Sequence, residues 1–117
     1  MTSQALIFKL SPRSAWLDAE ASGEFEGAPV DLSDGFIHFS TASQVRETAA
    51  RHFSGQDALI LAAIDPAPLG TALRWEPSRG GDLFPHLYGP LPMSAVVYVA
   101  DLPLGTDGVH VFPPSVR

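Results

Sequence analysis

The apolar run at residues 58–64 (ALILAAI) constrains the fold of this chain more than any other feature. No polar residue interrupts its seven positions, and a run of that length favours a strand buried on both faces over a helix. Further strands are predicted along the chain, and we expect the last of them to be central; they cover residues 5–10, 36–40, 72–76 and 93–100.

Helix signals lie in the first half of the chain. Ser11-Pro12 is a typical helix start, with Ser as the cap and Pro at the first helical position, and Gly23 is expected to end that helix. A second helix is predicted over residues 42–52, where apolar residues recur at i, i+4 and i+8. Because helices come early and strands late, the order favours an α+β fold with a mostly antiparallel, curved sheet.

Composition fits a single domain spanning residues 1–117. The chain is 45% hydrophobic and 17% charged, which is typical of a globular domain with its own core. It contains no cysteine, so disulfides and thiolate chemistry are excluded. Residues 24–32 are predicted to form an acidic, turn-rich link with at most a short strand around Phe25, and residues 113–117 to form a loose tail.

Charge and hydropathy limit the expected location and partners. No apolar run approaches the ~20 residues of a membrane span, and the N-terminus lacks the features of a secretory signal. We therefore expect a cytoplasmic protein without a membrane partner. The net charge of −6 argues against broad nucleic-acid binding, which needs clustered Lys and Arg. A small-molecule ligand held by one or two local cations remains compatible with it.

The stretch DGFIHFST at residues 34–41 is the first candidate site. Its Asp-Gly pair predicts a turn, and the strand that follows places His38 and Ser40 on one face. Thr41 then resembles a helix cap, with Gln44 completing a capping box. Since helix N-termini favour anions, this polar face predicts a phosphate-bearing ligand. The structural alternative is a core histidine that bonds a backbone carbonyl.

Glu76 is the strongest candidate for a catalytic carboxylate. It follows Arg74 and Trp75 at a predicted strand end, where it could bind a sugar hydroxyl or stabilise an oxocarbenium-like transition state. Trp75 offers a ring for stacking, and Arg79 in the next loop offers a cation. The structural alternative is a surface Glu paired with Arg74 or Arg79, worth at most ~1 kcal/mol.

A third candidate site lies in the aromatic segment LFPHLYGP at residues 83–90. His86 could orient a ligand or transfer a proton, and Tyr88 could stack on a planar ring. Their structural alternatives are a histidine that bonds loop backbone and a tethered core tyrosine. His52 lies in the last turn of the second helix, where a positive charge is favourable, and this favours a structural role.

Two other chemistries could use the same side chains. His38, His86 and Glu76 would form a two-histidine, one-carboxylate metal set, but no local signature such as HExxH supports it. Ser40 and His86 could form a nucleophile and its base, but nothing resembles a nucleophile elbow. We therefore expect no metal at the site.

The motifs at residues 34–41, Gln44, Trp75-Glu76 and residues 84–89 together resemble a small bacterial family, domain of unknown function 952. The resemblance covers nearly the whole chain, to about Leu102. Members of that family are similar in architecture to diphtheria-toxin-like ADP-ribosyltransferases, in which a split antiparallel sheet surrounds a cleft for NAD. The resemblance therefore implies an ADP-ribosyltransferase-like fold and NAD, or an NAD-derived nucleotide, as the cofactor.

The resemblance also implies roles for individual residues. Glu76 resembles the Glu that supports cleavage of the nicotinamide–ribose bond, and Ser40-Thr41 resembles the Ser-Thr element that positions the dinucleotide. The first strand offers Lys9 where those enzymes have Arg or His. A non-catalytic metabolite-binding module and a metal-dependent hydrolase are the alternative functions. The expected catalytic residues are Glu76, His38 and His86, and the expected cofactor-binding residues are Ser40, Thr41, Trp75, Arg79 and Tyr88.

Overall fold

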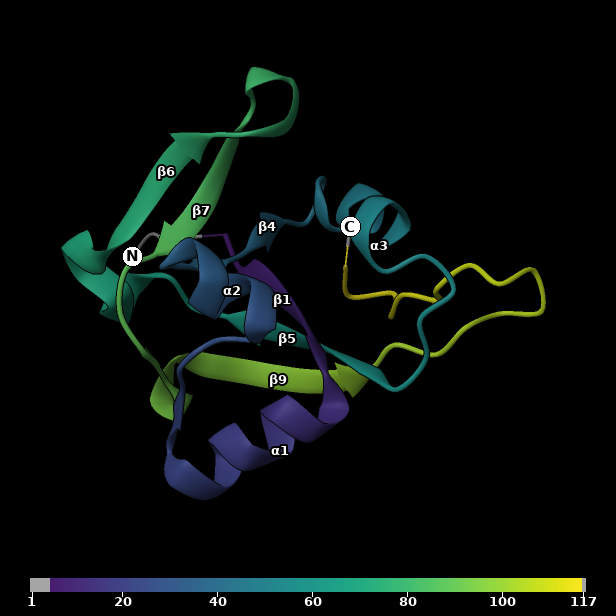
Figure 1. The fold of residues 1–117 in the computed structure, drawn as a ribbon, viewed down its shortest axis with the longest axis horizontal. Helices are drawn as coiled ribbons and strands as arrows, with labels where there is room; N and C mark the ends of the chain where they lie inside the picture. Colours follow the sequence, from purple (N-terminus) through teal and green to yellow (C-terminus); the bar gives the residue numbers. More distant parts are fainter. Residues whose placement is uncertain (1–4, 117) are drawn as a thin grey trace.

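The computed structural model describes residues 5–116, which form antiparallel sheets with helices packed around them (Figure 1). The strands are β1 (Ile7–Pro12), β2 (Glu24–Phe25), β3 (Ile37–His38), β4 (Ser40–Thr41), β5 (Leu59–Ile64), β6 (Leu73–Pro77), β7 (Leu83–Leu87), β8 (Leu91–Pro92) and β9 (Val96–Asp101). The α-helices are α1 (Arg13–Ser22), α2 (Pro29–Asp34) and α3 (Val45–His52). Short 3-10 segments are η1 (Ala67–Ala72), η2 (Arg79–Gly81) and η3 (Met93–Ala95).

The strands form one large sheet, one smaller sheet and a short ribbon. The large sheet has the order β4-β1-β5-β9, the smaller sheet has the order β3-β7-β6, and β2 pairs with β8. Every pairing within them is antiparallel. The predicted α+β class with antiparallel sheets is confirmed, whereas the likeness to ADP-ribosyltransferases stays a prediction.

β5 lies at the centre of the core, because both of its faces are covered. All six of its residues are buried, which confirms the prediction from the apolar run. Alternate side chains enter two hydrophobic clusters, as expected for a strand. One cluster takes Ile60, Ala62 and Ile64 and packs them against α1 and the smaller sheet. The other takes Leu59, Leu61 and Ala63 and packs them against α3 and the C-terminal segment.

Helix α1 begins one residue later than the predicted first position. Pro12 still has an extended backbone, with φ −56° and ψ 139°, and it pairs with Leu59 at the end of the β1–β5 ladder. The ladder therefore prevails over the Ser-Pro helix signal. The helix ends as predicted at Gly23, whose φ of 93° lies in the left-handed region that glycine adopts without strain.

The acidic link contains a helix that the sequence analysis did not predict. The short strand around Phe25 is confirmed as β2, but α2 follows it directly. Asp31 stabilises the first turn of α2 by accepting the Ala28 N–H at 2.8 Å, and Gly35, with φ 87°, ends it. Six residues are too few to show helical periodicity, which explains why the pattern gave no signal.

The predicted strand at residues 36–40 divides between the two sheets. β3 belongs to the smaller sheet and β4 to the large one, and the Phe39 N–H bonds the Pro85 carbonyl between them. The predicted second helix starts at Val45, later than expected. The Gln44 side chain does accept the Thr41 N–H at 3.0 Å, but the three residues after Thr41 form a turn.

The prediction that the last long strand is central is wrong. β9 starts at Val96, after the η3 turn, and lies at the edge of the large sheet. Its residues alternate between partly buried and exposed, as expected for a strand with one solvated face. The interior positions belong to β1 and β5 instead.

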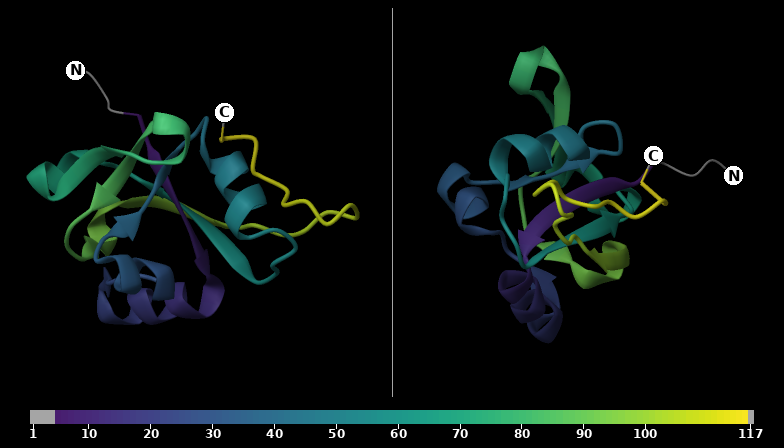
Figure 2. Two further views of the ribbon diagram at one scale, coloured as in Figure 1. Left: turned by 45° about the horizontal axis from the view of Figure 1, so that its top comes forward. Right: turned by 90° about the vertical axis from the view of Figure 1, so that its right-hand side faces the viewer.

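The C-terminal segment packs on the body of the protein and is not the loose tail that the sequence predicts. It runs beside α3 in both views of Figure 2. Val116 is buried in the second cluster, and its carbonyl accepts a 2.8 Å hydrogen bond from Arg46. This segment is thus anchored by one buried apolar side chain together with polar contacts, including that between the Tyr98 and Ser115 hydroxyls at 2.7 Å.

β6 and β7 form a hairpin that projects from the rest of the molecule (Figures 1 and 2). Within residues 5–116, no helix is long and apolar enough to cross a membrane.

Candidate functional site

Three strands bring the predicted polar residues onto one face of the smaller sheet. His38 of β3 lies directly opposite His86 of β7, and Arg74 of β6 lies opposite His86 from the other side. Because side chains alternate along a strand, Glu76 and Tyr88 share this face with them. Each of the three candidate clusters of the sequence therefore has at least one member on this face.

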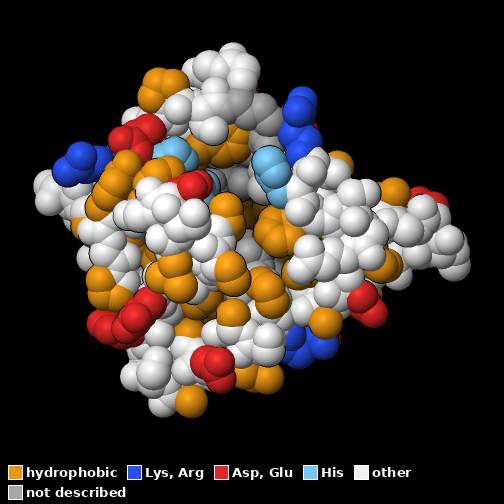
Figure 3. Space-filling model, in the orientation of Figure 1, with side chains coloured by type: hydrophobic (Ala, Val, Ile, Leu, Met, Phe, Trp, Pro, Cys, Tyr) orange, Lys and Arg blue, Asp and Glu red, His pale blue; other side chains and the backbone are white. Residues whose placement is uncertain are grey.

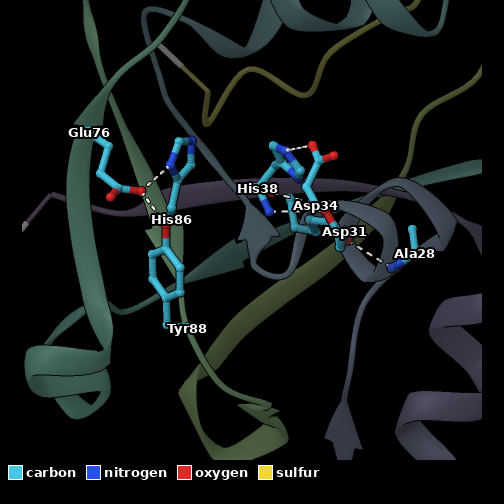
Figure 4. A network of polar contacts seen from close by, with 8 residues as sticks. Ala28, Asp31, Asp34, His38, Glu76, His86 and Tyr88 are labelled. Atoms are coloured by element: carbon cyan, nitrogen blue, oxygen red, sulfur yellow. Dashed lines mark hydrogen bonds and ion pairs between the residues drawn. The ribbon is translucent and has the colours of Figure 1, made fainter.

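Asp31 of α2 is the hub of the buried part of this network (Figure 4). Its carboxylate accepts hydrogen bonds from His38 Nδ1 at 2.6 Å, the His38 N–H at 3.0 Å and Lys9 Nζ at 2.9 Å. Burial acts to raise the pKa of this carboxyl, but the hydrogen bonds from His38 and the attraction of Lys9 outweigh it and lower the pKa to about 2. Asp31 is therefore ionised at neutral pH.

Lys9 lies buried on β1, an interior strand, and its ammonium is fully occupied. It contacts both oxygens of Asp31, at 2.9 and 2.8 Å, and the His38 carbonyl at 3.0 Å. Three acceptors match the three donors of an ammonium group. Burial lowers the pKa of Lys9, and the attraction of Asp31 acts in the opposite direction. Lys9 thus joins β1 to α2 and β3.

His38 binds a second carboxylate through its other ring nitrogen. Nε2 lies 2.9 Å from Asp34 Oδ2, while Nδ1 faces Asp31 (Figure 4). Each ring nitrogen of His38 therefore faces a carboxylate oxygen, and neither is left for a ligand. Carboxylates replace the backbone carbonyl that the structural alternative assigned to this histidine.

Glu76 holds His86 in one orientation. Its Oε1 atom lies 2.8 Å from His86 Nδ1 and accepts a 2.8 Å hydrogen bond from the Tyr88 hydroxyl (Figure 4). These bonds, that of His86 first, lower the pKa of Glu76, and the bond to Glu76 raises the pKa of Tyr88. Glu76 therefore stays ionised, and His86 keeps Nε2 for other partners. Arg74 lies over the Tyr88 ring, 4.8 Å from its centroid.

Phe36 covers this arrangement of rings. Its centroid lies 4.6 Å from that of His38, 4.2 Å from that of His86 and 5.2 Å from that of Tyr88. Aromatic contacts at such distances stabilise a pair by about 0.5–1.5 kcal/mol beyond burial. Phe36 therefore restrains both histidines at the same time.

A cavity of about 490 Å³ opens beside the two histidines. Histidine side chains surround a hollow on this face of the molecule (Figure 3). The cavity includes Lys9, His38 and His86 in its wall, together with His52 from α3. Four phenylalanine residues also line it, Phe8, Phe39, Phe53 and Phe84. A cavity of this size is in the range of small-molecule sites.

Some predicted site residues lie elsewhere. Ser40 lines the cavity, but its hydroxyl is 3.0 Å from that of Thr48. Thr41 and Trp75 line a different cavity, of about 470 Å³. Trp75 alternates with Arg74 and Glu76 along β6 and therefore faces the opposite side of that strand. The backbone of Arg79 belongs to η2, but its side chain lies outside the described residues.

The metal alternative finds no support in the described part of the chain. No group of three or more His, Asp or Glu side chains is arranged there to hold a metal ion. The two ring nitrogens of His38 contact Asp31 and Asp34, and Nδ1 of His86 contacts Glu76, so these nitrogens are not free to bind a metal.

Sequence reasoning missed three polar residues around this site. Asp31 and Asp34 lie on the unpredicted helix α2, and His52 was assigned to helix capping alone. Lys9 gave a usable signal, because a lone charge within an apolar strand needs a buried partner if the strand is interior.

Comparisons with known proteins agree with this fold. The chain is 53% identical to protein CC0527 from Caulobacter crescentus in its X-ray crystal structure, with a TM-score of 0.88 over 92% of this chain and 94% of that chain. The solution NMR structure of CC0527 is 54% identical over 91% of each chain, with a TM-score of 0.81. None of the curated proteins matches this chain.

The family comparison agrees with the motifs that the sequence analysis singled out. A family model described as "protein of unknown function (DUF952)" matches residues 10–99. That span includes the two paired histidines, the three carboxylates that bind them, and the covering phenylalanine. This chain belongs to the DUF952 family.

Proposed function

We propose that the histidine cavity binds NAD or an NAD-derived nucleotide and that His86 is its proton-transfer group. The observation that carries the proposal is the contact between Glu76 and His86 Nδ1 at 2.8 Å. A carboxylate on one imidazole nitrogen fixes the tautomer and leaves the other nitrogen to act as base or acid. Here the other nitrogen is Nε2, on a side chain that lines the cavity.

The lining of the cavity supports a nucleotide-like ligand. Its phenylalanine rings can contact a planar base or nicotinamide ring, and its hydroxyl and imidazole groups can bind ribose and phosphate oxygens. Most of such a lining is apolar with a few polar groups, which is typical of small-molecule sites.

Glu76 supplies the negative charge for this chemistry. Its side chain is 33% exposed, and Oε1 is shared by His86 and Tyr88. An ionised carboxylate stabilises the imidazolium that forms when His86 takes a proton. The same charge favours a ribosyl cation in the cavity, to which Glu76 is joined through His86, since the cavity wall does not include Glu76 itself. Glycosidic cleavage of the kind that ADP-ribosyltransferase-like enzymes perform needs both effects.

Nicotinamide release from NAD tests this proposal. Glu76→Gln keeps the size of the side chain but removes its charge, so we expect NAD binding to persist while release of nicotinamide is lost. Asp101→Asn is the matched control, because Asp101 forms an exposed ion pair with Arg13 far from this sheet. Turnover that survives in Glu76→Gln, or the absence of any melting shift with NAD at saturating concentration, would contradict the proposal. At 100 times its Kd, NAD should stabilise the fold by ~2.7 kcal/mol.

Binding without turnover is the second candidate function. The observation in its favour is that Lys9 and His38 already have carboxylate or carbonyl partners at every donor. These groups can shape a ligand site but have no free donor for catalysis. Ligand binding that depends on His86 while no bond is cleaved would support this candidate.

A further inference from the structure

His52 differs from the other charged or titratable groups in the cavity wall because, among the described residues, no polar contact occupies its side chain. It lies in the last turn of α3, is exposed and lines the cavity. Among the described residues no hydrogen bond or ion pair joins its ring to another side chain or to the backbone. A capping role for the helix alone does not require the imidazole to face a cavity.

The other groups in the wall cannot replace it. Lys9 has three acceptors for its three donors, and His38 has a carboxylate at each ring nitrogen. Two imidazole sites therefore remain available to a ligand, His86 Nε2 and the ring of His52. They come from β7 and α3, which lie on either side of β4 in Figure 1.

The charges around the cavity divide it into two ends. Asp34 lines it from α2 and repels an anion at that end. His52 belongs to a helix C-terminus, where a positive charge is stabilised. The Ser78 hydroxyl also lines the cavity and adds a neutral donor. The carboxyl end of α3 itself does not attract an anion. The preference for an anionic group at this side rests on its distance from the Asp34 carboxylate and on the donors that the His52 ring and Ser78 offer there.

We propose that His52 is a ligand-binding residue that recognises a phosphate group, while His86 contacts the part of the ligand that reacts. This inference rests on the proposed function for the existence of a ligand in the cavity, and it adds the ligand's polarity. The ligand class is a phosphate-bearing metabolite such as ADP-ribose, not an uncharged ring alone.

Proton NMR of the imidazole groups tests this directly, because the chain has only four histidines. His110 bonds the Gln56 carbonyl away from the cavity and serves as the internal reference. The probes are inorganic phosphate, ADP-ribose and nicotinamide, at pH about 6.5, near the ordinary pKa of imidazole. We expect ADP-ribose to shift the His52 and His86 signals together, phosphate to shift His52 more than His86, and His110 to stay constant.

Affinity measurements on His52→Gln complete the test. We expect ADP-ribose to bind tenfold or more weakly, because a charge-assisted hydrogen bond is lost, while nicotinamide binding is unchanged. Arg51→Gln is the matched control: it removes a cation one position away that pairs with Glu47 and is absent from this cavity wall. A loss as large in Arg51→Gln would show general charge attraction and would overturn the proposal.

The remaining outcomes separate this inference from the proposed function. If ADP-ribose binds His52→Gln as tightly as the unchanged protein but fails to bind His86→Gln, the role of His52 is refuted and the nucleotide site stands. If His52→Gln weakens nicotinamide and ADP-ribose equally, His52 has no phosphate preference and the inference is wrong. If no probe shifts His52 or His86, both proposals fail.

Discussion

Replacing Asp31 by Asn tests whether the buried ion pair holds α2 and β3 to the large sheet. The carboxylate of Asp31 is 1% exposed and its Lys9 partner 4% exposed. The Asn side chain has nearly the same shape as Asp but no negative charge. One of the two carboxylate oxygens that now accept hydrogen bonds is replaced by an NH2 group, which can only donate. The Lys9 ammonium is then buried with neutral acceptors alone, the His38 carbonyl and the one amide oxygen of the Asn.

The expected cost follows from that unpaired charge. Breaking a buried ion pair by removing one partner destabilises a protein by about 3–5 kcal/mol. For a chain of 117 residues, 1 kcal/mol corresponds to a change in Tm of about 4 °C. We therefore expect Tm to fall by roughly 12–20 °C, which is a large part of the stability of a domain of this size.

Urea unfolding at neutral pH, followed by circular dichroism, measures the free energy of unfolding of each variant. Asp101→Asn is the matched control, because it breaks the Arg13–Asp101 pair, whose side chains are 44% and 72% exposed, and should cost under about 1 kcal/mol. The double variant Lys9→Met/Asp31→Asn should recover part of the loss, because the uncompensated ammonium is gone. A loss below 1 kcal/mol in Asp31→Asn, or a double variant no more stable than it, would refute the reasoning.

Three further predictions concern stability. The pKa of Asp31 is about 2 in the folded protein and has an ordinary value of 3.8. About 2 kcal/mol of stability that is present above pH 3.8 should therefore be lost as the pH falls to about 2. Asp31→Asn should lack this part of the acid dependence. Gly27→Ala should destabilise more than Gly35→Ala, since both have positive φ but only at Gly27 would the new Cβ meet Asp31 Cβ, at 2.8 Å; equal melting temperatures would contradict this. Val116→Ala should cost about 2 kcal/mol and Val109→Ala, 60% exposed, under about 0.5, as measured by urea unfolding.

The parts of the fold that the sequence predicted are those decided by local pattern. The apolar run at β5 and the glycine that ends α1 needed no knowledge of distant residues. The position of β9 depended on which strands cover which faces, and hydrophobic content alone cannot rank an edge against a centre. The buried C-terminal segment is a similar case, because distant residues anchor it: Val116 packs in the second cluster and the Arg46 side chain bonds its carbonyl.

The candidate site divides along the same line. The alternation along the strands placed His38 on a polar face, and Arg74 and Glu76 on a shared face, and the structure agrees. What could not be predicted is the partner of each group. Asp31 is seven residues from His38 and 22 from Lys9 along the chain. No periodic pattern connects them, because α2 is too short to show helical periodicity in the sequence. The two carboxylates that bind His38 therefore could not be identified from the sequence.

Those unseen partners decide what the two central histidines can do. His38 and His86 are directly paired across neighbouring strands and share contact with Phe36, so strand geometry alone would make them equivalent. Two carboxylates occupy both nitrogens of His38, whereas one carboxylate occupies a single nitrogen of His86. A histidine held at both nitrogens has no ring nitrogen left for a ligand, whereas one held at a single nitrogen keeps its other nitrogen available. The unequal number of carboxylates therefore distinguishes two histidines that the strand pairing alone would make equivalent, and under the proposed function only His86 transfers a proton.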